Sequence, residues 1–239
     1  MIDMDRGNLS GINFNSSQLK TINKKMDEAR LKPVFHYPWA SLERELKTQG
    51  ISKFPMVGYG SLVNIKSAAV TLQDKSLKRN RPVIAFGARR IFNYIMPKNV
   101  ERYGPVSDHN CAALNVQTTN KITDTVNGIL FEITLDEISA IRSREIGYDL
   151  VPVATKNWNE NKDPPFLAYI LRCLDRPHIE KKLTSSNIVP HKKYYLTCRD
   201  GALQLGKDFL QFWLVTTYLA DGVTPVSNWE VNELPEIGK

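Results

Sequence analysis

The middle of the chain carries short apolar, β-branched runs separated by turn-forming residues, and this pattern constrains the fold more than any other feature. The runs occupy residues 83–95, 111–118, 126–134, 148–155 and 166–171. Runs of this length and composition predict five or six strands. Because no regular alternation of strand and helix accompanies them, they favour a curved mixed sheet or small barrel over a parallel nucleotide-binding sheet.

Helical patterns precede these strands. Ser16 or Ser17 can cap a first helix, in which apolar residues recur at helical spacing up to Ala29. Pro38 suits the first turn of a second helix, which ends at Gly50. No catalytic motif is visible in either helix.

Further helices are predicted between and after the strands. Residues 135–144 have helical composition, with Thr134 and Glu137 spaced as a capping box. Near the C-terminus the pattern becomes helical at residues 191–205 and again at residues 208–219. The sequence therefore predicts an α+β protein with strands in the middle and helices outside them.

A length of 239 residues is compatible with one large domain that buries its own core. We expect a barrel domain at residues 54–189, preceded by a helical extension at residues 1–53. Residues 190–239 are expected to form a second helical extension that packs on the barrel.

Composition argues against several classes of protein. The chain has no run of about 18 apolar residues and begins with a polar stretch, so we expect a cytoplasmic protein with no membrane segment. Its three cysteines, Cys111, Cys173 and Cys198, form no C-x-x-C pair, and its four histidines lack metal-site spacing. We therefore expect no metal site.

Residues 55–62, Pro-Met-Val-Gly-Tyr-Gly-Ser-Leu, are the most informative stretch. A short strand runs into Tyr59 between two glycines, and Ser61 can then cap a helix. Such a junction directs unpaired backbone N–H groups and the positive end of a helix dipole at one place, which suits a carboxylate or phosphate. From these residues alone, the stretch is either an anion site or an ordinary tight turn. It lacks the P-loop pattern.

Glu145 is the second feature of interest. It lies at the predicted end of the 135–144 helix, just before Gly147 and a strand. A carboxylate at a helix C-terminus meets the unfavourable end of the dipole, and burial would raise its pKa further, as a general acid and base requires. The alternative is an exposed glutamate paired with Arg142 or Arg144.

Together, five segments resemble the γ-glutamylcyclotransferase-like family and follow one another in its order. They are residues 58–62, 86–93, 113–116, 126–133 and 144–148. The resemblance extends over about residues 54–171. It implies a small mixed six-stranded β-barrel surrounded by helices, to which this chain adds extra N- and C-terminal helices. The pocket would lie at the mouth of the barrel.

The resemblance also implies a reaction. The α-amine of a γ-glutamyl group attacks its own side-chain carbonyl, giving 5-oxoproline and a free amine without metal or cofactor. The catalytic acid/base corresponds to Glu145. The substrate-binding residues implied are Tyr59, Gly60, Ser61 and Leu62 of the loop, with Tyr148 and Tyr169 in positions expected for pocket-side tyrosines. The expected partner is a small γ-glutamyl or otherwise carboxylated substrate.

Two other functions compete with this one. The same fold could serve as a non-catalytic module that binds a small carboxylated ligand. A net charge of +7 is also typical of proteins that bind nucleic acid. The sequence has no nucleic-acid-recognition motif to support that function, so no nucleic-acid partner is expected. The excess charge falls within residues 66–102, and we expect some of it to lie near the pocket mouth.

Overall fold

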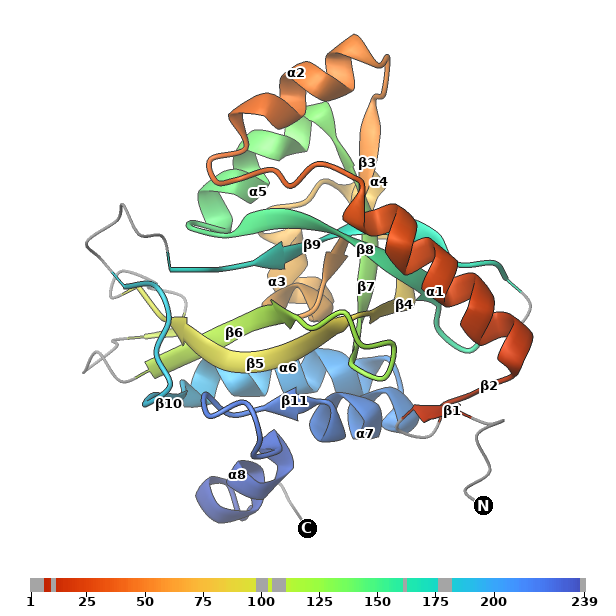
Figure 1. The fold of residues 1–239 in the computed structure, drawn as a ribbon. Helices are drawn as coiled ribbons and strands as arrows, with labels where there is room; N and C mark the ends of the chain where they lie inside the picture. The colour runs from red at the N-terminus through yellow and green to blue at the C-terminus, as the bar shows by residue number, and fades with distance from the viewer. Residues whose placement is uncertain are drawn as a thin grey trace.

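The computed structural model describes residues 7–9, 12–97, 103–104, 111–160, 163–175 and 182–236. Its elements are arranged around a closed five-stranded barrel (Figure 1). The barrel strands, in their order around it, are β3 (Lys53–Gly58), β7 (Thr125–Thr134), β4 (Arg81–Phe86), β8 (Asp149–Asn157) and β9 (Phe166–Arg172). Only the β3–β9 pair is parallel among these, so the barrel is mixed.

A second, four-stranded sheet lies beside the barrel. Its strands, in order, are β10 (Val189–Pro190), β6 (Cys111–Thr118), β5 (Ala88–Ile95) and β11 (Thr217–Tyr218). The central pair is antiparallel, and each two-residue edge strand is parallel to its neighbour. Both edge strands come from the C-terminal part of the chain.

The expected six-stranded barrel is therefore corrected to a five-stranded one. The run at residues 83–95 is two strands, because Gly87 turns the chain at φ +75°. That conformation is open to glycine and strained for other residues. It sends β4 into the barrel and β5 into the second sheet. The α+β class and the mixed barrel are confirmed.

Helices surround these sheets (Figure 1). The helical elements that precede β8 in the chain are α1 (Ser16–Arg30), α2 (Ala40–Thr48), the 3₁₀ turn η1 (Ser61–Val63), α3 (Ile65–Ala69), α4 (Asp74–Lys78), the 3₁₀ turn η3 (Leu135–Glu137) and α5 (Ile138–Arg144). Those that follow β9 are α6 (Lys192–Gln204), α7 (Lys207–Val215) and α8 (Val226–Glu233). At the N-terminus, β1 (Gly7–Leu9) and β2 (Ile12–Phe14) form a small antiparallel pair.

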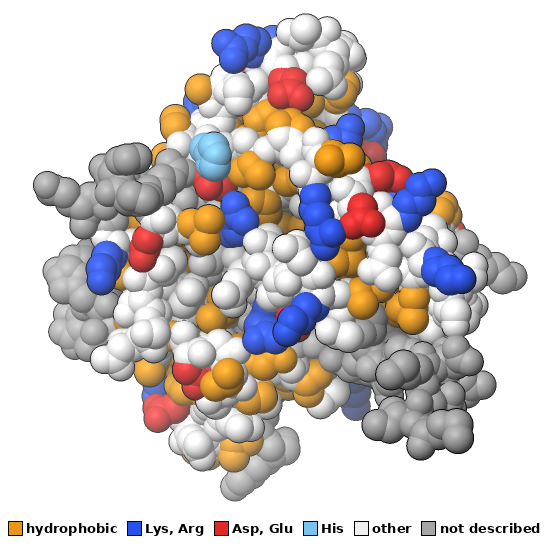
Figure 2. All heavy atoms as spheres, viewed as in Figure 1, with side chains coloured by type: hydrophobic (Ala, Val, Ile, Leu, Met, Phe, Trp, Pro, Cys, Tyr) orange, Lys and Arg blue, Asp and Glu red, His pale blue; other side chains and the backbone are white. Residues whose placement is uncertain are grey.

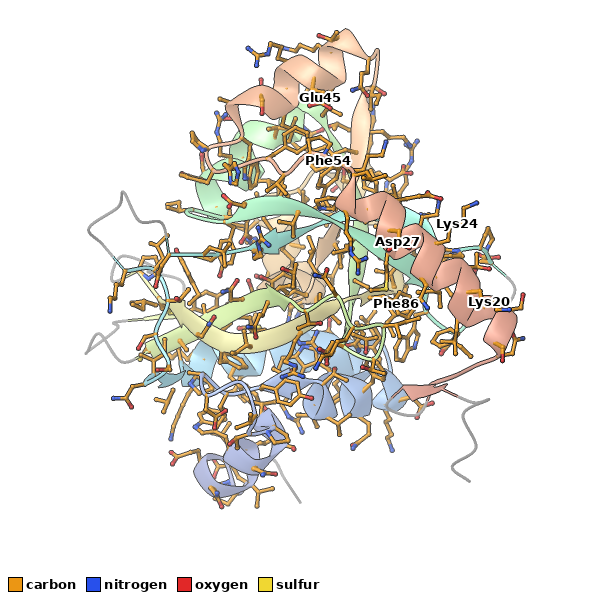
Figure 3. The ribbon with its side chains drawn as sticks, viewed as in Figure 1. Lys20, Lys24, Asp27, Glu45, Phe54 and Phe86 are labelled. Carbon is orange, nitrogen blue, oxygen red and sulfur yellow. The ribbon has the colours of Figure 1, made fainter. Side chains whose placement is uncertain are left out.

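Helix α1 shows how an amphipathic sequence attaches the N-terminal segment to the barrel. Its residues Ile22 and Met26 are buried, while Lys20, Lys24 and Asp27 point away from the protein (Figure 3). The helix begins one residue earlier than expected, because Asn15 is the cap. The Asn15 Oδ1 accepts from the Gln18 N–H at 2.9 Å, and Gln18 returns a bond to the Asn15 N–H.

Other helix boundaries differ in small ways. Helix α2 begins at Ala40, after a cis Tyr37–Pro38 bond and a left-handed Trp39, so Pro38 precedes the helix. The Thr134–Glu137 capping box is present, with a 3₁₀ turn preceding α5. The predicted helix at residues 208–219 ends at Val215 and gives way to β11.

A buried arginine joins the C-terminal segment to both sheets. Arg90 of β5 is fully buried and donates to the carbonyl and side-chain oxygens of Asn127 on β7, at 2.7 and 2.8 Å. It also donates to the Thr217 hydroxyl on β11 at 2.6 Å. Burial lowers the pKa of Arg90 to about 9, so the side chain stays charged at neutral pH. Its hydrogen bonds offset much of the cost of burying that charge.

Candidate functional site

The loop after β3 carries the first group of candidate residues. Tyr59 is buried, and its hydroxyl donates to the Leu171 carbonyl of β9 at 2.8 Å, which fixes the loop to the barrel. Burial raises the pKa of Tyr59 well above its usual range. Among the described residues, the N–H groups of Gly60, Ser61 and Leu62 have no backbone acceptor.

The helix expected after the loop is interrupted. A single 3₁₀ turn, η1, is followed by the five-residue α3. Asn64 caps α3 by accepting from the Ser67 N–H at 3.2 Å, so Ser61 is not the cap. The Ser61 Oγ instead accepts from Arg144 Nη2 at 3.0 Å. Because both helical pieces are short, the loop N–H groups matter more to an anion than the helix dipole does.

Glu145 occupies the C-cap of α5. Its N–H donates to the Ile141 carbonyl at 2.9 Å, and its side chain is only 15% exposed. Gly147 then reverses the chain at φ +82°, leading into Tyr148 and β8. The end of α5 and this turn place the carboxylate near the loop, where it lines the same space as Ser61.

Arg144 fixes the carboxylate in relation to the loop. Its Nε donates to Glu145 Oε1 at 3.0 Å. Its Nη1 donates to the Ser67 carbonyl and the Thr71 hydroxyl, and its Nη2 donates to the Ser61 and Ser67 hydroxyls. A guanidinium has five N–H donors, so all of them are matched by acceptors of the protein. This buried pair holds the Glu145 carboxylate in one position beside the loop.

Glu145 lines two neighbouring spaces. The outer one is a cleft of about 520 Å³, within the range of small-molecule sites. The inner one is a chamber of about 20 Å³, with room for roughly one water molecule. The residues that line both are Ser61, Glu145, Tyr148 and Tyr194.

Tyrosines form the walls of both spaces. The Tyr148 hydroxyl donates to the Leu114 carbonyl at 2.6 Å, and the Leu114 N–H donates to the Tyr194 hydroxyl at 3.4 Å. The Tyr94 hydroxyl donates to the Ile146 carbonyl at 2.9 Å, and its ring lies 4.7 Å from that of Tyr148. Burial raises the pKa of Tyr94, Tyr148 and Tyr194, so these phenols stay neutral at physiological pH.

Tyr194 comes from α6, outside the barrel, and lies directly against the loop. A Cβ added to Gly60 would meet the Tyr194 hydroxyl at 2.5 Å. Helix α6 reaches this position because Gly201 lets it approach the backbone after η1. A Cβ there would meet the Asn64 nitrogen at 2.5 Å and the Val63 carbonyl carbon at 2.7 Å. The C-terminal segment thus supplies a wall of the site.

The structure brings six of the seven candidate residues together. Tyr59, Gly60, Ser61, Leu62, Glu145 and Tyr148 all line the inner chamber. Tyr169 does not join them. It packs against Phe35 and Phe54, with ring centroids 5.4 and 6.2 Å away, on another part of the barrel. Phe54 is labelled in Figure 3.

Sequence reasoning missed Tyr94, Tyr103 and Tyr194 as wall residues. Arg144 belongs to a motif noted in the sequence, but the sequence did not predict that it hydrogen-bonds both Glu145 and the loop. Its position next to Glu145, at the end of a helix and before a glycine, was the available signal. No comparable signal marked Tyr194, because only the packing of α6 brings it to the loop.

None of the described basic residues of the span at residues 66–102 lines the cleft. Arg89 pairs with Asp124 at 3.0 Å, and Arg90 is buried in the protein. Lys98 and Arg102 lie outside the described residues. On the face drawn in Figure 2, Lys and Arg side chains are spread among acidic and apolar ones. The positive charge at the described cleft comes from Arg144 instead.

Comparisons with solved structures identify the fold. YkqA from Bacillus subtilis matches with a TM-score of 0.50 and 14% identity, over 71% of this chain and 55% of YkqA. An uncharacterised human protein matches with a TM-score of 0.48 and 12% identity, over 68% and 86% of the two chains. A γ-glutamyl cyclotransferase matches with a TM-score of 0.49 and 10% identity, over 67% and 86%.

These likenesses concern the fold alone. The chain spans about half the length of YkqA. No family model and no curated protein sequence matches it. Within the described parts of the chain, none of the helices has the length and apolar character needed to cross a membrane.

Proposed function

We propose that the chain is a γ-glutamylcyclotransferase-like enzyme that converts a small γ-glutamyl amine to 5-oxoproline and the free amine. The observation that carries this proposal is the position of Glu145. Its side chain is only 15% exposed, is oriented by Arg144, and lines both the chamber and the cleft. A proton acceptor held in this way can reach a bound substrate.

The proposed reaction needs one such group. Glu145 takes a proton from the substrate α-ammonium, and the resulting amine attacks the γ-carbonyl carbon of the same molecule. A five-membered ring closes, and Glu145 returns the proton to the leaving nitrogen as the amide C–N bond breaks. The ring nitrogen gives up its second proton to the released amine, which leaves as an ammonium. Because both reacting groups belong to one molecule, holding the substrate folded supplies much of the rate through effective molarity.

The loop would orient the γ-glutamyl head. The N–H groups of Gly60, Ser61 and Leu62 suit the substrate carboxylate. The inner chamber alone is too small for that group, since the Tyr194 hydroxyl occupies the space beside Gly60. We therefore place the head at the junction of the two spaces, next to Ser61 and Glu145, with the leaving amine toward the cleft.

A second candidate is a non-catalytic module that binds a small carboxylated ligand at the same place. The tight contact between Tyr194 and Gly60 favours it, because this contact narrows the chamber that would receive the substrate head. The buried carboxylate of Glu145 favours the enzyme.

The test is release of 5-oxoproline from a panel of γ-glutamyl compounds: the glycine, ethylamide and benzylamide conjugates, and glutathione. The enzyme proposal predicts saturable release from at least one of them. Saturable binding without 5-oxoproline from any would support the binding module instead. Neither binding nor turnover across the panel would reject both.

A further inference from the structure

The outer cleft has a chemical character of its own. Its aromatic wall consists of Tyr94, Tyr103, Tyr148 and Tyr194. The rings of Tyr103 and Tyr194 meet edge to face at 5.2 Å. The hydroxyls of Tyr94 and Tyr148 donate to backbone carbonyls, so their O–H donors are used within the protein. What these two side chains offer a ligand is ring surface.

The mouth of the cleft is also apolar. Val70 and Ile146 line it and are 72% and 50% exposed. Met96 and Ala113 continue this surface inward. An exposed apolar rim that leads to an aromatic wall is the kind of surface that binds apolar groups.

Polar side chains line the other end of the cleft, around Arg144 and Glu145. Arg144 is the cation among the described lining residues, and its five donors are matched by Glu145, Ser61, Ser67 and Thr71. A ligand carboxylate in the outer cleft would have to compete with these contacts. An apolar ring would need none of them.

We propose that the outer cleft receives the leaving-amine half of the substrate, and that this half is an aromatic or similarly apolar amine without a carboxylate. The inference rests on the proposed function for the identity of the γ-glutamyl half. The tyrosine wall would bury the ring, and Glu145, at the polar end, would face the amide nitrogen.

The test measures binding separately from turnover. Glu145→Gln, which keeps a side-chain oxygen for Arg144 Nε, is titrated by calorimetry with γ-glutamylbenzylamide and with γ-glutamylglycine. Burying one aromatic ring predicts that the benzylamide binds about tenfold or more tightly than the glycine conjugate. Equal affinities, tighter binding of the glycine conjugate, or no binding of either compound would overturn the inference.

A charge placed at the rim sharpens this test. Val70→Lys adds a cation at the exposed mouth and should improve binding of γ-glutamylglycine by roughly threefold to tenfold while weakening that of the benzylamide. Val223→Lys is the matched control, because Val223 is also 72% exposed and does not line the cleft. If both lysine variants changed the two affinities alike, the cleft would not be the site of the leaving group.

Turnover by the unmodified protein distinguishes the two proposals. Preferential binding of the benzylamide without 5-oxoproline release would support the apolar subsite and reject the cyclotransferase. Release of 5-oxoproline with preference for γ-glutamylglycine would support the cyclotransferase and reject the apolar subsite.

Discussion

Gly60 belongs to the loop that the family resemblance implies binds the substrate, and it also leaves room for Tyr194. In the structure, the group closest to its open side is the Tyr194 hydroxyl, which a Cβ would meet at 2.5 Å. The next atom of the Tyr194 ring lies 3.7 Å from that Cβ, an ordinary contact distance.

This geometry predicts that Gly60→Ala destabilises the protein by about 1–3 kcal/mol through overpacking. The same change in a Tyr194→Phe background should cost much less, because the clashing oxygen is gone. Urea denaturation of the wild type, both single variants and the double variant measures the coupling. Additive effects would show that Tyr194 does not contact Gly60 in solution.

Arg144 is a positioning residue in this account. Lysine keeps the charge but cannot make the fork of contacts to Glu145, Ser61 and Ser67. Arg144→Lys should therefore lower kcat about 10- to 100-fold, with a smaller change in KM, because a displaced base loses reactive geometry. Steady-state kinetics and the pH–rate profile are measured alongside a thermal melt. An unchanged kcat in a folded variant would remove Arg144 from the mechanism.

At the scale of elements, α6 is the helix that delivers Tyr194, and its N-terminus depends on His191. The His191 Nδ1 accepts from the Tyr194 N–H at 3.4 Å, which requires a neutral ring. Burial, assisted by the charge of Lys193, lowers the pKa of His191 below its usual 6.5. The folded protein thus resists protonating the group that caps this helix.

Below about pH 6.5 the unfolded chain binds more protons at His191 than the folded chain does, so this contribution to stability is present above 6.5 and lost as pH falls. His191→Asn keeps a cap acceptor and removes the titration. Lowering the pH from 7.5 to 5.5 should therefore lower the Tm of the wild type more than the Tm of the variant. A constant difference would exclude His191 as a source of acid sensitivity.

Some elements could be predicted from the sequence because local rules determine them. The amphipathic spacing of α1 and the Thr134–Glu137 capping box are examples. The split between β4 and β5 at Gly87 was missed because a continuous apolar run hides a turn that needs a positive φ. The two-residue strands β10 and β11 are too short to show a strand pattern in the sequence. They form by pairing with β6 and β5.

At the scale of the whole molecule, hydrogen bonds connect the C-terminal segment to the two sheets and connect its own helices to one another. Arg90 joins β5 and β7 to β11, and Glu230 of α8 accepts from Arg199 Nε of α6 at 2.8 Å and from the Tyr195 hydroxyl. The sequence indicated a helical addition to the barrel. It could not indicate that this addition lines the cleft, since that depends on packing between segments far apart in the chain.

The loop and Glu145 were identified from sequence because they belong to short ordered motifs. Their assembly into one site depends on the barrel, which brings the end of β3 next to the end of α5. The tyrosine wall combines residues from β5, from the segment between β5 and β6, from the turn just before β8 and from α6, so no local pattern could have predicted it.

The central claim is that Glu145 moves the proton during closure of a γ-glutamyl ring. The most direct measurement compares 5-oxoproline release by wild type and Glu145→Gln on the best substrate of the panel, with calorimetric Kd values for both proteins. Glu43→Gln, which makes the same chemical change at a half-buried pair with Arg142 that does not line the cleft, is the control. We predict that Glu145→Gln lowers kcat about 10²- to 10⁴-fold with little change in Kd, while the control is unaffected. Turnover by Glu145→Gln at the wild-type rate would contradict the account.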